Sequence, residues 1–191
     1  MFTFCPSCAS KNIAFEKDKY FHCPDCGFVY YHNTAAATGC VIEADGRLLF
    51  LVRGKEPAKG KLDLPGGFVD PDEGALEGLY REIREELGWS PPFLKGEPFP
   101  KGASNAPGAP LNRVFNFLAS FSNRYPYKNI IYNTCDMYFY LSAPGLCERD
   151  LTLEKGEIAA VRFLKPEEID FGEIAFDSTR RAVQAYLSSV K

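Results

Sequence analysis

Residues 67–89, GFVDPDEGALEGLYREIREELGW, constrain the fold of this 191-residue chain more than any other stretch. They carry Glu82, Glu85 and Glu86 within one helical pattern. Offsets of three and four residues place side chains on one face of a helix, one turn apart. Like charges spaced in this way repel each other by roughly 0.2–0.5 kcal/mol per pair on an exposed helix. A purely structural helix gains nothing from this arrangement, so the pattern indicates a positive group among the carboxylates.

The same stretch predicts the ends of the helix and its buried face. We expect Asp70 as N-cap, Pro71 at the first helical position and Glu73 at the third, which is a capping-box pattern. Gly88 stands where a left-handed C-terminal residue is expected. Apolar residues with helical spacing predict the inner face: Leu76, Leu79, Tyr80, Ile83 and Leu87. The three glutamates then lie on the side that faces the Gly66–Gly67 turn.

This stretch resembles the Nudix box, the signature of the Nudix hydrolase family. The family pattern is Gly, five residues, Glu, seven residues, then Arg-Glu-apolar-x-Glu-Glu-x-Gly-apolar. The matching positions are Gly67, Glu73, Arg81, Glu82, Ile83, Glu85, Glu86, Gly88 and Trp89, where a smaller aliphatic residue is usual at the last position. The resemblance implies an α+β Nudix fold over residues 33–191, with a mixed β-sheet sandwiched between α-helices.

The rest of residues 33–191 agrees with that order of elements. Alternating apolar patterns predict strands within residues 38–53, 62–64, 115–143 and 156–164. Asp45–Gly46 is a two-residue hairpin signal. Residues 176–190 predict a closing helix with Asp177 or Ser178 as its cap. The Pro- and Gly-rich residues 91–110 predict a mobile loop or insertion.

Residues 1–32 predict a separate small module. Cys5, Cys8, Cys23 and Cys26 form two Cys-x-x-Cys pairs, a spacing that suits tetrahedral zinc. The segment resembles a zinc ribbon in which all four thiolates are ligands, so the Zn²⁺ is expected to be structural. About thirty residues cannot bury a core large enough to fold alone, and the metal supplies the missing free energy. A redox Cys-x-x-Cys pair is the alternative. Of the other cysteines, Cys40 and Cys135 are expected to be buried in strands.

Carboxylates without histidine or thiolate among them favour hard cations, so we expect catalytic Mg²⁺ or Mn²⁺. The resemblance implies that Glu82, Glu85 and Glu86 hold this metal. Either Glu85 or Glu86 is then closest to a general base, and that choice stays open. Glu157 resembles the downstream glutamate that completes the catalytic site in some relatives, with an ordinary solvent-facing charge as an equal alternative.

Three further residues are expected to support the site. The resemblance implies that Glu73 and Arg81 pair and so brace the loop against the helix. Gly67 lies in a turn whose glycines let backbone amides approach a phosphate or a metal-bound oxygen closely.

The ribbon and the box together are similar to NADH pyrophosphatases, which split NAD(H) into a mononucleotide and AMP. That subgroup carries Ser-Gln-Pro-Trp-Pro-Phe-Pro downstream of the box, where this chain has residues 120–126, SFSNRYP. Ser120 and Pro126 match and Tyr125 replaces Phe, whereas Gln, Trp and two Pro are missing. NADH, NAD⁺ and ADP-ribose therefore stay open as small-molecule substrates. Arg53 and Tyr125 are candidate substrate contacts, because Arg53 belongs to a basic approach to the turn and Tyr125 can stack on a base.

Composition argues against two classes of partner. The net charge is −3 and the pI is about 5.5, so no global basic field attracts nucleic acid. The chain has no run of about 18 apolar residues, as a membrane span requires. Its first residues, MFTFCPSC, lack a charged-then-apolar leader and predict a cytoplasmic protein. The oligomeric state stays open, and a homodimer is compatible with the sequence.

The alternative to an enzyme is a non-catalytic ligand-sensing or adaptor module that uses its zinc ribbon to bind a partner. The intact carboxylate set favours the enzyme, because Nudix regulators that have lost hydrolysis usually have degraded boxes.

Overall fold

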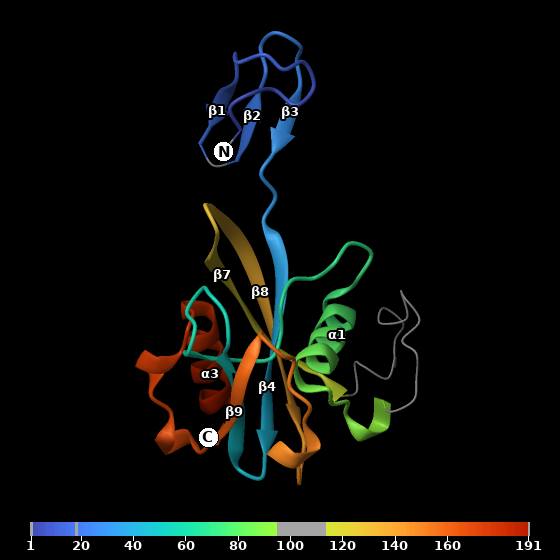
Figure 1. Ribbon diagram of the computed structural model, residues 1–191, viewed down its shortest axis with the longest axis vertical. Helices are drawn as coiled ribbons and strands as arrows, with labels where there is room; N and C mark the ends of the chain where they lie inside the picture. The colour runs from blue at the N-terminus through green and yellow to red at the C-terminus, as the bar shows by residue number, and fades with distance from the viewer. Residues whose placement is uncertain (1, 18, 95–113, 191) are drawn as a thin grey trace.

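The computed structural model describes residues 2–17, 19–94 and 114–190, and it forms two sheets (Figure 1). The first sheet is antiparallel and consists of β1 (Ala14–Glu16), β2 (Tyr20–His22) and β3 (Val29–Tyr31). Residues 32–34 connect β3 directly to the larger sheet. The insertion predicted at residues 91–110 lies mostly outside the described residues.

The larger sheet is mixed. Its strands are β4 (Ala35–Ala44), β5 (Arg47–Arg53), β6 (Leu62–Asp63), β7 (Asn116–Tyr127), β8 (Ile130–Ser142) and β9 (Ile158–Leu164). They follow the order β6-β5-β4-β8-β7, and β9 also pairs with β5. The central pair, β4 and β8, is parallel, whereas the other pairs are antiparallel. The predicted hairpin turn has Asp45 at φ 51° and Gly46 at φ 79°, the positive values of a two-residue hairpin loop.

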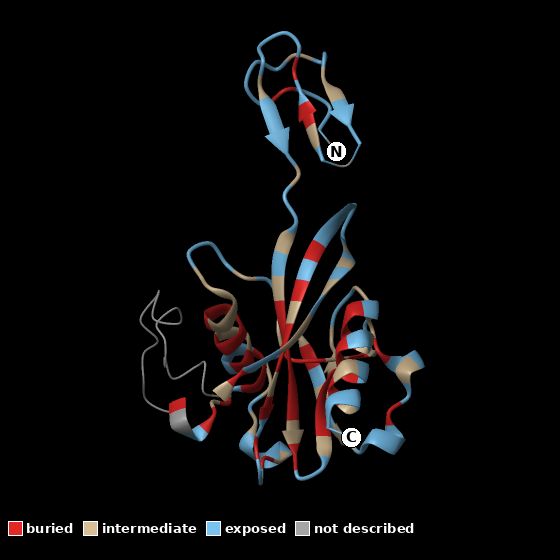
Figure 2. Ribbon diagram, turned by 180° about the vertical axis from the view of Figure 1, so that it is seen from behind, coloured by how far each residue is buried: buried red, intermediate tan, exposed pale blue. Residues whose placement is uncertain are grey.

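Two long helices cover the sheet, one on each face (Figures 1 and 2). They are α1 (Ala75–Leu87) and α3 (Asp177–Ser189), and the short 3₁₀ helices are η1 (Pro92–Leu94), η3 (Glu148–Asp150), η4 (Pro166–Glu168) and η5 (Phe171–Glu173). None of the helices within the described ranges is long and apolar enough to cross a membrane.

Each helix packs on its own hydrophobic core. The core under α1 joins Leu79 and Ile83 to Ile42 and Phe139, and the core under α3 joins Val183 to Phe50 and other buried side chains. Alternate residues of one strand supply opposite faces, as the buried neighbours Val41 and Ile42 of β4 do. The α+β architecture predicted from the sequence, a mixed sheet between helices, is therefore confirmed.

The predicted start of the box helix is wrong. The helix begins at Ala75 rather than Pro71, and Asp72 has a φ of +69°, which a right-handed helix cannot contain. Eight residues of helix span about 12 Å, whereas Glu73 Oε1 lies 2.9 Å from Arg81 Nε. The chain must therefore fold back before the helix begins for this ion pair to form.

Two smaller predictions also fail. The N-cap of α3 is Phe176 rather than Asp177 or Ser178, because the buried Ser178 hydroxyl donates to Asp136 instead. Cys40 is buried as predicted, whereas Cys135 is exposed. Cys135 stands in β8 between the buried Thr134 and Asp136, so strand alternation turns its side chain to the opposite, exposed face.

Candidate functional site

Arg81 lies at the centre of a hydrogen-bond network on α1. Its Nε and Nη2 donate to the two oxygens of Glu73 at 2.9 and 3.1 Å, which is the predicted pairing. Its Nη1 donates to Glu82 Oε1 at 2.8 Å and to Glu85 Oε2 at 3.0 Å, and Nη2 also donates to the carbonyl of Phe68 at 2.9 Å. In this structure Arg81 is therefore a positive group between two of the glutamates and ties both to the loop before the helix.

Glu82 and Glu86 face the glycine turn that precedes the helix. Glu86 Oε2 accepts a hydrogen bond from the Gly66 amide at 2.9 Å. The Glu82 carboxylate lies so close to Gly67 that a Cβ there would come within 2.6 Å of Oε1. The Thr38 amide of β4 donates to the Gly67 carbonyl at 2.8 Å, so the sheet holds the turn in place. Glycine is needed at position 66, where the backbone of β4 leaves no room for a Cβ, and at Gly67 a Cβ would take the space of the Glu82 carboxylate.

Burial and neighbouring charges raise the pKa of two of these carboxyls. Burial is the largest cause for Glu86, whose pKa lies well above the usual value, and nearby Glu82, Asp63 and Glu157 add to the shift against the opposing Gly66 hydrogen bond. Burial also raises the pKa of Glu82, although Arg81 opposes the shift. The side chain of Glu85 is the most exposed of the three box glutamates, at 52%.

Glu157 lies beside these carboxylates because its segment runs along the end of α1. The Thr152 amide donates to the Leu87 carbonyl at 2.8 Å, and the Glu154 amide donates to the Glu86 carbonyl at 3.1 Å. The carboxylate of Glu157 forms an ion pair with Lys55. The downstream glutamate that sequence reasoning singled out thus reaches the electrostatic neighbourhood of Glu82 and Glu86.

The residues present fit a divalent cation. Glu82, Glu86 and Glu157 supply oxygen donors alone, which suits Mg²⁺ or Mn²⁺. The raised pKa of Glu86 shows that its buried charge is poorly balanced by the protein. Among the described residues, however, only the cysteine cluster brings three or more ligand atoms within 4.8 Å of one another. The glutamates do not converge to that degree while Arg81 bonds Glu82 and Glu85.

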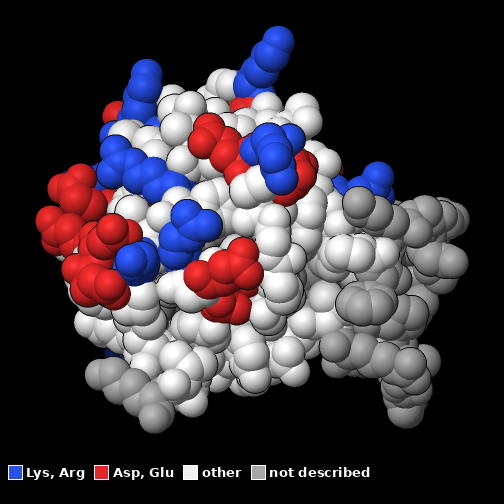
Figure 3. Space-filling model, turned by 90° about the horizontal axis from the view of Figure 1, so that it is seen from below, with Lys and Arg blue, Asp and Glu red and all other residues white. Residues whose placement is uncertain are grey.

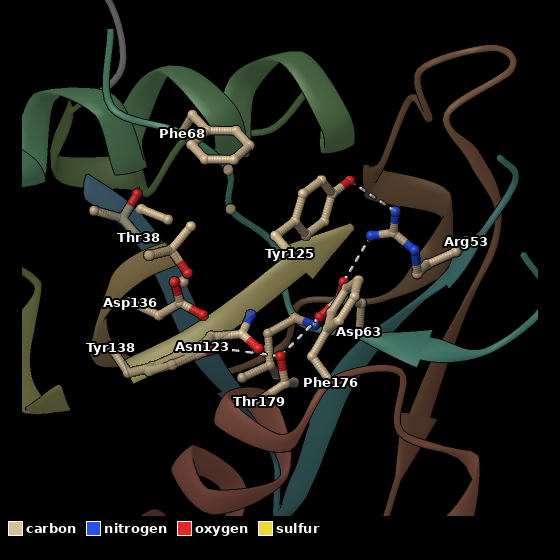
Figure 4. Close-up of a pocket in the computed structure, with 16 residues that line it drawn as sticks. Thr38, Arg53, Asp63, Phe68, Asn123, Tyr125, Asp136, Tyr138, Phe176 and Thr179 are labelled. Carbon is tan, nitrogen blue, oxygen red and sulfur yellow. Dashed lines mark hydrogen bonds and ion pairs between the residues drawn. The ribbon is translucent and has the colours of Figure 1, made fainter. Parts of the chain in front are cut away.

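A pocket of about 120 Å³ adjoins the glycine turn (Figure 4). Its wall includes Gly66 and Gly67, so it shares the turn with Glu82 and Glu86. The other lining residues are Ala37, Thr38, Gly39, Arg53, Asp63, Leu64, Phe68, Asn123, Tyr125, Thr134, Asp136, Tyr138, Phe176 and Thr179. The acidic face of α1 and the pocket therefore adjoin each other at the glycine turn.

Both candidate substrate contacts line this pocket. The guanidinium of Arg53 bonds Asp63 at 2.8 Å, reaches the Tyr125 hydroxyl at 3.5 Å and lies over the Phe176 ring, 5.0 Å from its centroid. Tyr125 packs edge-to-face on Phe68 at 5.5 Å and contacts Phe176 at 5.4 Å. Figure 4 shows Tyr125 between Phe68 and Arg53.

Two lysines of the segment between β5 and the glycine turn have acidic partners. Lys55 pairs with Glu157, and Lys61 pairs with Glu173 at 3.0 Å. At the end of the molecule opposite β1–β3, Figure 3 shows positive and negative side chains interspersed, so that face has no field of a single sign.

The four N-terminal cysteines converge as the sequence predicted. Their sulfurs all lie within 4.8 Å of one another. The two knuckles have the same geometry: the Cys5 amide donates to Ser10 and the Cys23 amide to Phe28, each at 2.8 Å. The fourth residue after each of these cysteines has a positive φ, 60° at Ala9 and 75° at Gly27. Four thiolates in one cluster fit a tetrahedral metal with no open position.

A comparison with protein families identifies the larger part of the chain. The model of the NUDIX domain matches residues 32–185. The chain belongs to the NUDIX family. The matched range includes the acidic face of α1, Glu157 and every residue that lines the pocket.

Curated relatives match this NUDIX chain over shorter segments. The ADP-ribose pyrophosphatase of Methanocaldococcus jannaschii is 43% identical over 63 residues, which is 33% of this chain and 37% of that protein. The NAD-capped RNA hydrolase NudC of Chromobacterium violaceum is 38% identical over 85 residues, 44% of this chain and 32% of that protein. The alignments thus span about a third of the length of each relative.

A solved structure supports the NUDIX fold over nearly the whole chain. The NUDIX hydrolase from Nitrosomonas europaea superposes with a TM-score of 0.62 at 21% identity, and the match covers 97% of this chain and 90% of that one.

Sequence reasoning missed several residues of the pocket: Asp63, Phe68, Asn123, Asp136, Phe176 and Thr179. The signal for Asp136 was weak, because a polar residue among alternating apolar ones predicts an outward-facing position. Its face of β8 also carries Thr134 and Tyr138, and all three are buried. The burial of these polar residues can be recognised only when it is known that α3 packs on this face of β8.

Proposed function

We propose that this chain hydrolyses the diphosphate bond of a nucleoside diphosphate derivative in a reaction that requires Mg²⁺ or Mn²⁺. The leading substrate candidates are NADH or NAD⁺ and ADP-ribose. One observation carries the proposal: the partly buried Glu82 and the buried Glu86 meet an aromatic and polar pocket at the shared Gly66–Gly67 turn. Such an arrangement can hold a diphosphate beside the acidic face while the attached group enters the pocket.

In this proposal Glu82, Glu85 and Glu86 hold the cation, with Glu157 as a further acidic neighbour. A divalent cation would neutralise charge on phosphoryl oxygens. It would also lower the pKa of a bound water, so that hydroxide is available near neutral pH. Arg81 and Glu73 orient the ligands, and Gly67 leaves the space that Glu82 occupies. Either Glu85 or Glu86 accepts the proton of the attacking water.

The substrate class rests on the names of the relatives. One is an ADP-ribose pyrophosphatase and others are NAD-capped RNA hydrolases, so both printed substrates contain an adenosine diphosphate unit. The pocket suits that unit, because aromatic rings stack on bases and Arg53 offers donors to an anion. An RNA carrying NAD at its 5′ end is a second candidate on the strength of these relatives alone.

We further propose that residues 1–32 form a zinc ribbon with structural Zn²⁺ and that residues 33–191 form the hydrolase domain. All seven cysteines are free in the structure, which agrees with a reducing compartment such as the cytoplasm.

The test is hydrolysis of a substrate panel by the purified full chain with Mg²⁺ or Mn²⁺. The panel contains NADH, NAD⁺, ADP-ribose, a diadenosine polyphosphate, a nucleotide sugar and NAD-capped RNA. We expect Glu85→Gln and Glu86→Gln each to lower kcat by roughly 10²–10⁴-fold on the preferred substrate, with the exposed Glu167→Gln as matched control. Unchanged turnover in both variants would refute these catalytic roles. No turnover of any substrate would leave the ligand-sensing module as the better account.

A further inference from the structure

Two buried polar atoms of β8 face the pocket without a partner. Asp136 and Thr134 are two residues apart on one face of the strand, and they are only 7% and 3% exposed. Among the described residues, neither Asp136 Oδ1 nor Thr134 Oγ1 has a hydrogen-bond partner. Buried polar atoms are nearly always paired with protein or ordered solvent. These two atoms and Thr38 Oγ1 of β4, a third unpaired atom in the wall of the same pocket, therefore indicate a polar ligand.

The other oxygen of Asp136 is fixed. Ser178 Oγ donates to Asp136 Oδ2 at 2.6 Å, and the Tyr138 hydroxyl in turn donates to Ser178 at 3.1 Å. Tyr138 and Ser178 are both buried, so this chain of hydrogen bonds holds the carboxylate in one orientation. The free oxygen, Oδ1, is thereby a positioned acceptor.

The rings of Phe68, Tyr125 and Phe176 supply apolar walls to the same pocket. Phe68 is 38% exposed, so its ring is available to a ligand. Figure 4 shows Tyr125 and Phe176 to the right of Asp136 and Phe68 above it. A planar heterocycle packs well on such rings and presents its edge groups sideways.

We propose that Asp136, together with Thr134, recognises an NH₂ group, either an amine or a carboxamide, carried by the heteroaromatic ring of the substrate and so determines specificity. This proposal rests on the proposed function and adds to it the chemical group that is recognised. An ionised carboxylate can only accept hydrogen bonds, whereas the threonine hydroxyl can donate to a ring nitrogen or a carbonyl beside the amino group. An analogue with oxygen in place of the amino group would set an acceptor against an acceptor, which such sites reject strongly.

Two parts of the candidate substrates carry this chemistry. Adenine has an amino group beside a ring nitrogen, and nicotinamide has an amide NH₂ beside its carbonyl. The binding affinities of mononucleotides show which of these two groups, adenine or nicotinamide, the pocket recognises. AMP is compared with IMP, and nicotinamide mononucleotide with nicotinic acid mononucleotide, by calorimetry on the full chain. In one pair we expect about tenfold or larger preference for the mononucleotide that carries the NH₂ group. This pair identifies the half of the substrate in the pocket.

Asp136→Asn should reduce that preference to about twofold or less, because an amide offers a donor as well as an acceptor. Glu167→Gln should keep the preference of the unmodified protein. Equal binding within both pairs by the unmodified protein, or full preference retained in Asp136→Asn, would overturn the proposal. So would the lack of measurable binding of all four mononucleotides.

Thr134→Val separates ligand recognition from a structural role. The hydroxyl that it removes has no partner in the described protein, so the melting temperature should stay the same or rise. Affinity for the preferred mononucleotide should nevertheless fall severalfold. A lower melting temperature with unchanged affinity would instead make Thr134 a structural residue. Binding needs no turnover, so a protein that discriminates AMP from IMP without hydrolysing any substrate would refute the proposed function and leave this inference standing.

Discussion

The buried position of Glu86 lowers the stability of the folded protein. It is 8% exposed, and its main hydrogen bond in the structure comes from the Gly66 amide. A carboxylate buried next to Glu82, Asp63 and Glu157 is hard to ionise. A neutral side chain of the same shape would make the fold more stable. A buried charge at such a position therefore indicates that a ligand needs it.

Glu86→Gln should therefore stabilise the metal-free protein at neutral pH. Glutamine keeps an oxygen for the Gly66 amide and removes the buried charge, and we expect a gain of roughly 1–3 kcal/mol. That corresponds to a rise of a few degrees in melting temperature. Thermal unfolding in a chelating buffer measures it. A lower melting temperature would mean that the charge of Glu86 is balanced by the protein after all.

The same carboxyl predicts a pH dependence of stability. Its folded pKa lies above its usual value of 4.5, so between these two values the folded protein binds more protons than the unfolded one. The stabilising contribution of protonated Glu86 is then complete below pH 4.5 and is lost as pH rises through the folded pKa. The free energy of unfolding should fall with pH across this window in the metal-free protein. Glu86→Gln should flatten the slope, as denaturant titrations at several pH values would reveal.

At the scale of elements, the site depends on the turn between β6 and α1 as much as on the helix. The two glycines of this turn are crowded by different neighbours. A Cβ at Gly66, which has φ +145°, would come within 2.1 Å of the Thr38 carbonyl, whereas one at Gly67 would meet the flexible end of Glu82 at 2.6 Å. The backbone of β4 at Thr38 cannot shift to make room for a Cβ, whereas the end of the Glu82 side chain can rotate away.

Alanine at these two positions should therefore have different effects. Gly66→Ala should destabilise the fold by about 2–5 kcal/mol, through backbone strain and overlap with β4. Gly67→Ala should leave the melting temperature nearly unchanged while it displaces Glu82 and lowers kcat by about 10–100-fold. Paired measurements of melting temperature and kcat on both variants test this. Equal loss of stability in the two would contradict it.

The elements also show what the sequence could predict. Local patterns were sufficient for the strands of the larger sheet, for the C-terminal stop at Gly88 (φ 57°) and for the apolar stripe of α1. In residues 1–32 they predicted a β-hairpin and missed its third strand, β3. They failed at the start of α1, where Asp72 has a positive φ and Glu73 pairs with Arg81 instead of opening the helix. The pocket was beyond local patterns, since Asp136, Phe68 and Phe176 come from three distant segments that only the tertiary fold brings together.

At the scale of the whole molecule, the two sheets have separate cores. Phe21 is fully buried in the N-terminal sheet, where it contacts Phe2, Phe15 and Tyr30. The two cores of the larger sheet contain none of these residues. One module can therefore lose its structure without removing packing from the other.

Removal of the metal should unfold the N-terminal module alone. We expect about one Zn²⁺ per chain in the purified protein, and its loss in Cys8→Ser or Cys26→Ser, both of which change exposed residues. The main thermal transition should stay within about 2 °C of the unmodified protein, because surface changes away from a core have small effects. Metal analysis and calorimetry test this. A zinc-free chain with an ordered N-terminal sheet would show that the metal is dispensable.

The division of the site between α1 and β8 has an evolutionary consequence. The acidic residues come from a helix on one face of the sheet, and Asp136 and Thr134 project from the opposite face; the two groups meet at Gly66 and Gly67. Substitutions on β7 and β8 can then alter which molecule is accepted without disturbing the carboxylates. Descendants of one ancestral chain can thus acquire new substrates by a few changes on two strands, while the helix stays under unchanged selection.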